Sequence, residues 1–226
     1  MEHLRASPLI DELAAIAPEL QVAGGMFGHW MQHPGDIPAS KRERVRNNAQ
    51  RRATDECLAR LLARVGLPGV APARLASGRR NWPAGYTGSV THSGVTVAAA
   101  IAPVDQMRSL GIDIERLDGK EVPGFQGLTE GQRPLAVVTD ADASTVAFCA
   151  QEAAYKALEP VLGHTIDVSD VAVSWSQLGS VRSCGVARAG GTAIEVRCSA
   201  AIASWVVTAA LWPCPPHPGS SRPATT

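Results

Sequence analysis

The chain has 226 residues, of which 45% are hydrophobic and 19% charged, and this composition is typical of a folded protein with a core of its own. Twenty-one basic residues balance 21 acidic ones, so a globally cationic nucleic-acid or membrane binder is disfavoured. Aromatic residues make up only 4%, which predicts an interior of small and branched aliphatic side chains.

The cysteines and the apolar segments indicate the compartment. The five cysteines show neither Cys-x-x-Cys spacing nor histidines at zinc-ligand spacing, so we interpret them as buried or free thiols in a reducing compartment. The first residues are charged and lack the apolar run of a signal peptide. The longest apolar stretch, residues 200–212, is too short to span a bilayer. We therefore expect a cytoplasmic protein with no membrane partner.

The first half of the chain is predicted to contain two helices followed by a strand hairpin. Residues 7–20 read as a short amphipathic helix, and 23–40 as a loop rich in Gly and Pro. Residues 41–65 lack Gly and Pro and place their leucines on one face, which predicts a long helix. A Pro- and Gly-rich connection over 66–88 leads to a strand, turn and strand over 89–102.

The predicted long helix carries most of the basic charge of this half. Eight of its residues between Lys41 and Arg64 are lysine or arginine, with few acids between them. A solvated helix face is the ordinary interpretation, and a surface that faces phosphate or a carrier protein is the alternative. A nucleic-acid binder using this helix is a weaker rival, because the overall charge is neutral.

The second half is predicted to contain one helix among several strands. A polar connector over 103–109 precedes a strand over 110–115, and residues 118–143 are rich in loops. Residues 145–158 read as a helix that Pro160 interrupts. Further strands are predicted over residues 171–175, 181–187, 193–198 and 204–212.

These elements predict an α+β fold with two similar subdomains in a pseudo-dimer, each a long helix packed on an antiparallel sheet. We expect the N-terminal subdomain to comprise residues 1–106 and the C-terminal subdomain residues 107–212. Residues 213–226 are rich in Pro and Ser and are predicted to be a disordered tail.

Residues 111–115 alternate apolar and acidic side chains in the order Gly-Ile-Asp-Ile-Glu. On a strand, Asp113 and Glu115 therefore share one face, and the two isoleucines point into the core on the other. Neighbouring carboxylates repel unless a cation lies between them, and Mg²⁺ binds such oxygen ligands. An acidic, solvent-facing strand edge is the alternative interpretation of this motif taken alone.

On the predicted helix, Glu152, Tyr155 and Lys156 occupy positions i, i+3 and i+4 and share one face. Glu152 suits a third oxygen ligand or a general base, and Lys156 suits a clamp on phosphate. The alternative is an ordinary surface pair of Glu and Lys that contributes little to stability.

In a third motif, residues 82–93, a Gly-rich segment leads into a predicted strand. Thr91 and His92 precede a turn that begins at Ser93 and Gly94, an arrangement that suits an anion. The alternative is that His92 is an ordinary structural histidine.

Together these motifs resemble the 4′-phosphopantetheinyl transferase superfamily of the enterobactin-synthase and surfactin type. The family patterns are Trp-Pro-x-Gly-x-x-Gly-Ser-x-Thr-His, Gly-(Ile/Val)-Asp-x-Glu and Phe-Ser-x-Lys-Glu-(Ala/Ser)-x-x-Lys. They match residues 82–92, 111–115 and 148–156 here, in the same order. The resemblance extends over roughly residues 41–212, and the closing strand at 205–208 also looks like the end of the family's fold.

The resemblance implies an enzyme that moves 4′-phosphopantetheine from coenzyme A to a serine of an apo acyl or peptidyl carrier protein. It implies release of 3′,5′-ADP, Mg²⁺ as cofactor, and a role in polyketide, nonribosomal peptide or siderophore biosynthesis. A monomer whose partners are coenzyme A and the carrier, and not nucleic acid, is expected. The carrier serine would attack the β-phosphate of coenzyme A.

The resemblance also implies a role for each matching side chain. Glu152 would draw the proton from the carrier serine, and Lys156 would neutralise the pyrophosphate. Thr91 and His92 would contact the 3′-phosphate of the nucleotide. The implied metal ligands are Asp113, Glu115 and Glu152. The implied coenzyme A-binding residues are Arg79, Arg80, Thr91, His92, Asp113 and Lys156.

Several positions depart from the family pattern. Gln151 replaces a lysine directly before the helix glutamate, which removes a positive charge, and Cys149 replaces a serine. Asp55 aligns with an arginine of the first long helix that reaches the nucleotide phosphate, with Arg51 and Arg52 one turn away. These changes leave an alternative open, a catalytically impaired homologue that binds coenzyme A or a carrier protein without transfer.

Overall fold

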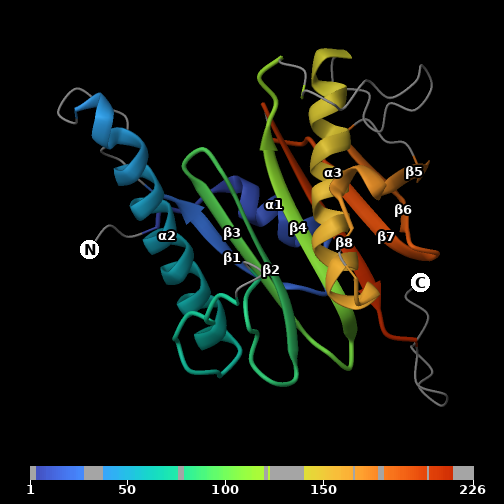
Figure 1. The fold of residues 1–226 in the computed structure, drawn as a ribbon, viewed down its shortest axis with the longest axis horizontal. Helices are drawn as coiled ribbons and strands as arrows, with labels where there is room; N and C mark the ends of the chain where they lie inside the picture. The colour runs from blue at the N-terminus through green and yellow to red at the C-terminus, as the bar shows by residue number, and fades with distance from the viewer. Residues whose placement is uncertain are drawn as a thin grey trace.

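The computed structural model describes residues 4–27, 38–75, 79–119, 122, 140–164, 166–177, 181–202 and 204–215. Within these residues the chain forms two antiparallel sheets and three α-helices, which confirms the expected α+β class. Figure 1 shows the two sheets side by side, with one long helix beside each.

The first sheet has three strands in the order β1-β3-β2. Its strands are β1 (Gln21–Met26), β2 (Tyr86–Ser93) and β3 (Thr96–Pro103). The long helix α2 (Ala39–Arg64) packs on this sheet through Leu58, Leu61 and Leu62, which are buried against Val97 and Ile101. Burial of these branched side chains on both faces of the contact gives the N-terminal half a core of its own.

The second sheet has five strands in the order β4-β8-β7-β6-β5. Its strands are β4 (Met107–Arg116), β5 (Ala172–Gln177), β6 (Arg182–Ala189), β7 (Thr192–Ser199) and β8 (Trp205–Pro213). The helix α3 (Asp140–Leu162) crosses this sheet, and a single turn of 3₁₀-helix, Val168–Asp170, precedes β5. Four alanines of α3 are fully buried, so the helix lies close against the strands; they are Ala150, Ala153, Ala154 and Ala157.

A third core joins the two halves. The short helix α1 (Pro8–Ile16) contributes Leu9 and Leu13 to a cluster that also contains Ala100 of β3, Ile112 of β4 and Ala209 of β8. Because one apolar cluster takes residues from both sheets, the halves are packed together beneath the surface where β2 approaches β4. The pseudo-dimer arrangement stays a prediction, as does the division at residues 106 and 107, which falls in the turn between β3 and β4.

The predicted loop over residues 23–40 was wrong for its first part, because residues 23–26 belong to β1. The two glycines there are needed for close packing. A Cβ on Gly24 would lie 2.4 Å from the Val97 carbonyl oxygen, and one on Gly25 would lie 2.3 Å from the Arg5 carbonyl oxygen. Glycine in a strand can mark a close backbone approach as well as a loop.

The remaining predicted elements were right in kind and differ at their ends. The helix α1 ends at Ile16, before the predicted end at residue 20, and β4 begins inside the predicted polar connector. The helix α3 continues through Pro160 to Leu162, whose side chain packs on the apolar cluster of α3. Most of the predicted loop over 118–143 lies outside the described residues.

The predicted disordered tail begins too early, because Pro213 ends β8 and the backbone N–H of Cys214 donates to the Gln106 carbonyl at 3.0 Å. Residues 216–226 lie outside the described part of the chain. All five cysteines are described, and none forms a disulfide. Within the described ranges, no helix has both the length and the apolar character needed to cross a bilayer.

Candidate active site

The acidic motif lies on β4 with its two kinds of side chain on opposite faces. Ile112 and Ile114 are fully buried in the core shared by the two halves. Asp113 and Glu115 line a cavity on the other face, beside α3. The alternation of the sequence therefore places both carboxylates as predicted, and the side chain of Asp113 is only 4% exposed rather than at a solvated strand edge.

Close contact between β4 and α3 brings the helix motif to this strand. A Cβ on Gly111 would lie 1.9 Å from the Ala153 carbonyl oxygen, so only glycine allows this approach. Next to it, the Ser109 hydroxyl donates to the Ala157 carbonyl at 2.7 Å. These contacts hold α3 so that Glu152 and Lys156 face the strand.

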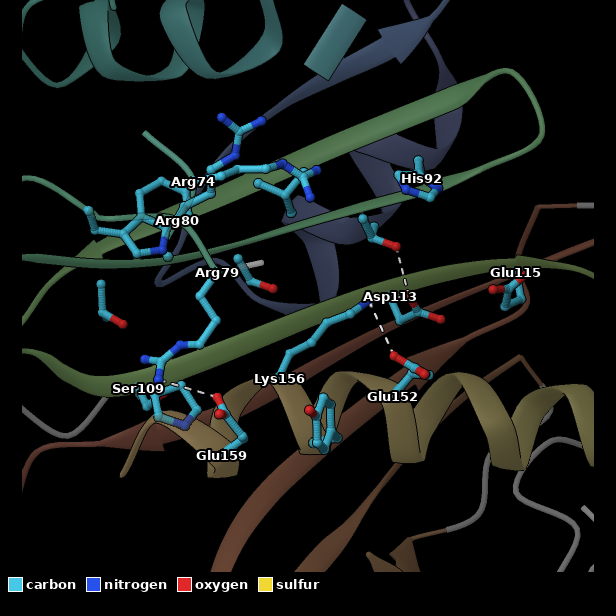
Figure 2. Close-up of a pocket in the computed structure, with 18 of the residues that line it drawn as sticks. Arg74, Arg79, Arg80, His92, Ser109, Asp113, Glu115, Glu152, Lys156 and Glu159 are labelled. Carbon is cyan, nitrogen blue, oxygen red and sulfur yellow. Dashed lines mark hydrogen bonds and ion pairs between the residues drawn. The ribbon is translucent and has the colours of Figure 1, made fainter. Parts of the chain in front are cut away.

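Lys156 connects the carboxylates of the two motifs. Its ammonium Nζ donates to Asp113 Oδ1 at 2.6 Å and to the Ile112 carbonyl at 3.3 Å, and it lies 3.8 Å from Glu152 Oε2. The three charged side chains thus meet at one point between strand and helix, as Figure 2 shows. Tyr155 lines the same cavity.

A row of hydroxyl groups on β2 completes this cluster, and its role was not predicted from the sequence. The Ser89 hydroxyl accepts from the Ile112 N–H at 3.1 Å, Thr91 donates to Asp113 Oδ1 at 2.7 Å, and Ser93 donates to Glu115 Oε2 at 3.0 Å. The three residues are two apart in sequence and so share one strand face. That spacing was the available signal, but only the fold brings β2 next to β4.

The carboxylates of this cluster carry more negative charge than Lys156 balances. Burial, and next the charge of Asp113, raise the pKa of Glu115 to about 7, although the Ser93 hydroxyl works against the shift. Burial also raises the pKa of Glu152, opposed by Lys156. Burial disfavours the charged form of Lys156, but Asp113 and Glu152 outweigh it, so the pKa of Lys156 is raised.

The donors of this cluster fit a hard divalent cation. Asp113 Oδ2 is buried and has no hydrogen-bond partner among the described residues, although Oδ1 of the same group has two. Within the described part of the chain, no three Asp, Glu, His or Cys side chains stand close enough to hold a metal alone. Mg²⁺ usually takes one or two carboxylates together with water and substrate phosphates, so a complete protein cage is not required.

The cavity has a volume of about 530 Å³ and a cationic end opposite the carboxylates. Arg74, Arg79 and Arg80 line this end, and Figure 2 shows them apart from Asp113, Glu152 and Glu115. Both Arg79 and Arg80, named from the sequence, are bound to acids. Arg79 Nη1 lies 3.3 Å from Glu159 Oε2 on α3, and Arg80 Nη2 lies 2.9 Å from Asp55 Oδ1 on α2.

Arg74 is a cavity residue that was not predicted from the sequence. It stands in the connection between α2 and β2, where an isolated bridge pairs its backbone with that of Arg80. Its guanidinium makes no ion pair within the described residues. No motif marks Arg74, and only the folding of this connection over the cavity reveals it. His92, predicted from the sequence, also lines the cavity, and burial lowers its pKa.

Gln151 points away from this site. Its amide Nε2 donates to the Val171 carbonyl at 2.7 Å, just before β5, and Gln151 does not line the cavity. Gln151 is therefore not among the groups that surround Asp113 in this structure.

Comparisons with known proteins bear on the class of protein to which this chain is similar. No family model matches the chain. The chain is 28% identical over 170 residues to the 4′-phosphopantetheinyl transferase Npt of Nocardia iowensis, covering 68% of this chain and 73% of Npt. It is 28% identical over 144 residues to the 4′-phosphopantetheinyl transferase PptT of Mycobacterium tuberculosis, covering 58% of this chain and 62% of PptT. These two distant relatives support the superfamily that the three sequence motifs indicated.

Proposed function

We propose that this chain transfers the 4′-phosphopantetheine group of coenzyme A to a serine of an apo acyl or peptidyl carrier protein, releases 3′,5′-ADP and uses Mg²⁺. One observation carries the proposal: Lys156 joins Asp113 and Glu152 in a cavity whose other end is cationic. The relatives Npt and PptT, both named 4′-phosphopantetheinyl transferases, support the reaction class.

The two ends of the cavity suit the two anionic parts of coenzyme A. Asp113, with one or both of Glu115 and Glu152 and with water, would hold Mg²⁺, which when bound would neutralise charge on the diphosphate oxygens. Lys156 would add its positive charge there. The separate phosphate of the ribose fits the opposite end, beside Arg74 and Arg79. Each end of the cavity thus offers positive charge to one phosphate-bearing part of the ligand, and the two contacts together orient the ligand in the cavity.

The reaction itself needs a base and a stabilised leaving group. The serine oxygen attacks the phosphorus that bears the pantetheine chain, and the bond from that phosphorus to the bridging oxygen breaks. The bonding electrons leave with 3′,5′-ADP, and the hydroxyl proton passes to Glu152. Because burial raises the pKa of Glu152, its basicity lies closer to neutral pH than that of an exposed carboxylate. Thr91 donates to Asp113, so we assign it the orientation of that carboxylate.

The alternative, a catalytically impaired homologue, rested on Gln151 and Asp55, and the structure does not favour it. Gln151 is bound to the Val171 carbonyl outside the cavity, and Asp55 is paired with Arg80. Neither residue removes a group from the cluster of Asp113, Glu152 and Lys156. A binding protein without activity is therefore not the preferred proposal.

We also propose a subtype, a division into subdomains, a compartment, an oligomeric state and a group of pathways for this chain. We assign the chain to the enterobactin-synthase and surfactin type, with two similar subdomains divided near residues 106 and 107. We propose a cytoplasmic monomer that serves carrier proteins of polyketide, nonribosomal peptide or siderophore pathways. The packing of α2 and α3 each on its own sheet supports the division.

Mass spectrometry of carrier proteins tests the proposal directly. The protein is incubated with coenzyme A, MgCl₂ and several apo carrier proteins, and each carrier is weighed before and after. We expect a gain of one phosphopantetheine group, which disappears when EDTA replaces MgCl₂ or when the carrier serine is changed to alanine. Tight binding of coenzyme A with no gain on any carrier would contradict the enzyme.

A further inference from the structure

A second hollow, of about 560 Å³, adjoins the cavity at its cationic end. The two share Arg74, Arg80 and His92, so a ligand that fills one reaches the border of the other. The remaining lining residues of the second hollow all come from α2. They are Asn47, Gln50, Arg51 and Asp55.

Asp55 is the one acid that lines this hollow, within the described part of the chain. Its carboxylate accepts from Arg80 Nη2 at 2.9 Å, while Arg80 Nη1 donates to the Pro72 carbonyl at 2.7 Å. The side chain of Asp55 is 53% exposed and that of Arg80 only 12%. The carboxylate therefore faces the hollow, and the guanidinium of Arg80 is already bound to chain atoms.

This pair reduces the positive charge available to an anionic ligand. Of the three arginines in the hollow, Arg80 is neutralised by Asp55, and Arg51 and Arg74 are left to meet a phosphate. His92 adds little at neutral pH, because burial lowers its pKa. An exposed carboxylate also repels a phosphate group directly.

We propose that Asp55 is a specificity-determining residue that weakens the preference of this site for the ribose 3′-phosphate of coenzyme A. The chain then takes coenzyme A lacking that phosphate (3′-dephospho-coenzyme A) nearly as well as coenzyme A itself. This inference rests on the proposed function, because it assigns the ribose phosphate to the cationic end.

The experiment compares coenzyme A and 3′-dephospho-coenzyme A as phosphopantetheine donors in one assay. The kcat/KM for transfer to a carrier protein is measured with coenzyme A and with 3′-dephospho-coenzyme A, and their ratio is taken for each variant. Asp55→Asn removes the charge and keeps the shape, and Asp55→Glu keeps the charge. Glu56→Gln is the matched control, because Glu56 is the next residue of α2, pairs with Arg60 and lines neither hollow.

We expect the ratio to be close to one in the native chain and in Glu56→Gln and Asp55→Glu. In Asp55→Asn it should rise in favour of coenzyme A by about threefold to tenfold, the effect of one screened unit charge near a phosphate dianion. Damage to the fold lowers both rates together and leaves the ratio unchanged. The rise should shrink as NaCl is added, because salt screens exposed charges.

A native ratio far above one, or an unchanged ratio in Asp55→Asn, would overturn the inference. A fall in the ratio would also overturn it, since it would show that Asp55 holds Arg80 in place for the phosphate. If no donor supports transfer, the proposed function fails. Calorimetric binding of the two donors to the same variants then still tests Asp55, and binding of neither donor would overturn both proposals.

Discussion

The two ends of the cavity are built in different ways. At the acidic end, Asp113 and Glu115 stand on β4, Glu152 and Lys156 stand on α3, and the backbones of strand and helix fix their positions. At the cationic end, the three arginines stand on a connection between α2 and β2, and Arg79 and Arg80 are held by ion pairs to acids of α3 and α2. Regular elements fix side chains more tightly than ion pairs near the surface. Substitutions at the acidic end should therefore remove nearly all transfer activity, and substitutions at the cationic end should reduce it by degrees.

The largest effect is expected at the acidic end from Asp113→Asn. The change keeps the shape of the side chain and removes the charge that Lys156 binds at 2.6 Å. Transfer should fall by about 10³-fold, the size seen when a charged or polar group at a reacting centre is lost. Steady-state transfer to a carrier protein measures it, with circular dichroism to show that the variant is folded. An activity within about tenfold of the native chain would contradict the role given to Asp113.

The next largest loss of transfer is expected at the contact between β4 and α3, which positions the acidic end. Gly111→Ala would place a Cβ 1.9 Å from the Ala153 carbonyl oxygen, so α3 must move away from β4. We expect the free energy of unfolding to fall by ~3 kcal/mol and transfer to fall with it, because Glu152 and Lys156 move too. Urea denaturation measures the first and the carrier assay the second.

Gly69→Ala is the control for this substitution, since its new Cβ would meet no atom closer than the Ala59 carbonyl oxygen at 3.3 Å. It should change the free energy of unfolding far less. Equal losses in the two variants would show that the contact between β4 and α3 is not special.

Smaller, graded effects are expected at the cationic end. Arg74→Ala should raise the KM for coenzyme A about tenfold, the loss of one charge-assisted hydrogen bond. Arg79→Ala should raise it less, because Arg79 is already paired with Glu159 and its side chain is 44% exposed. The two KM values, measured with kcat, decide the order. A larger effect from Arg79 would show that its ion pair opens to meet the ligand.

The smallest effect on transfer is expected from Gln151→Lys. The family pattern places a lysine here, yet Gln151 Nε2 binds the Val171 carbonyl and lies outside the cavity. We expect kcat/KM to stay within about twofold and the free energy of unfolding to fall by ~1 kcal/mol as this hydrogen bond is lost. A clear gain in kcat/KM would show that a lysine at this position reaches the ligand.

Local patterns were enough to predict where the side chains of the acidic end lie. The alternation over residues 111–115 assigns each side chain to a face, and helical spacing brings Glu152 and Lys156 together. The turn at Gly94, which has a φ of 57°, was also visible as a break between two strands. In each case a pattern of fewer than about ten residues is enough to fix the local geometry.

The features that the sequence did not predict depend on contacts between distant segments. Arg74 looks like any arginine of a loop until the connection folds over the cavity, and Gly24 looks like a loop residue until β1 meets β3. Pro160 lies inside α3 because packing near the end of the helix outweighs the lost hydrogen bond. Tertiary contacts determine the structure at these positions, and the local spacing of residues does not indicate those contacts.

The hydroxyl row of β2 bears on how a large ligand enters. β2 and β4 are edge strands of different sheets, and Ser89, Thr91 and Ser93 link them through side chains rather than through a backbone ladder. The two bonds to carboxylates contribute about 1.5–3 kcal/mol each and the bond from the Ile112 N–H about 1 kcal/mol, so a few side-chain contacts hold this boundary and both sheets stay intact without them. The shared core beneath, with α1, keeps the halves together. Local opening at this boundary would expose Asp113 and Glu115 to a ligand that enters between the two sheets.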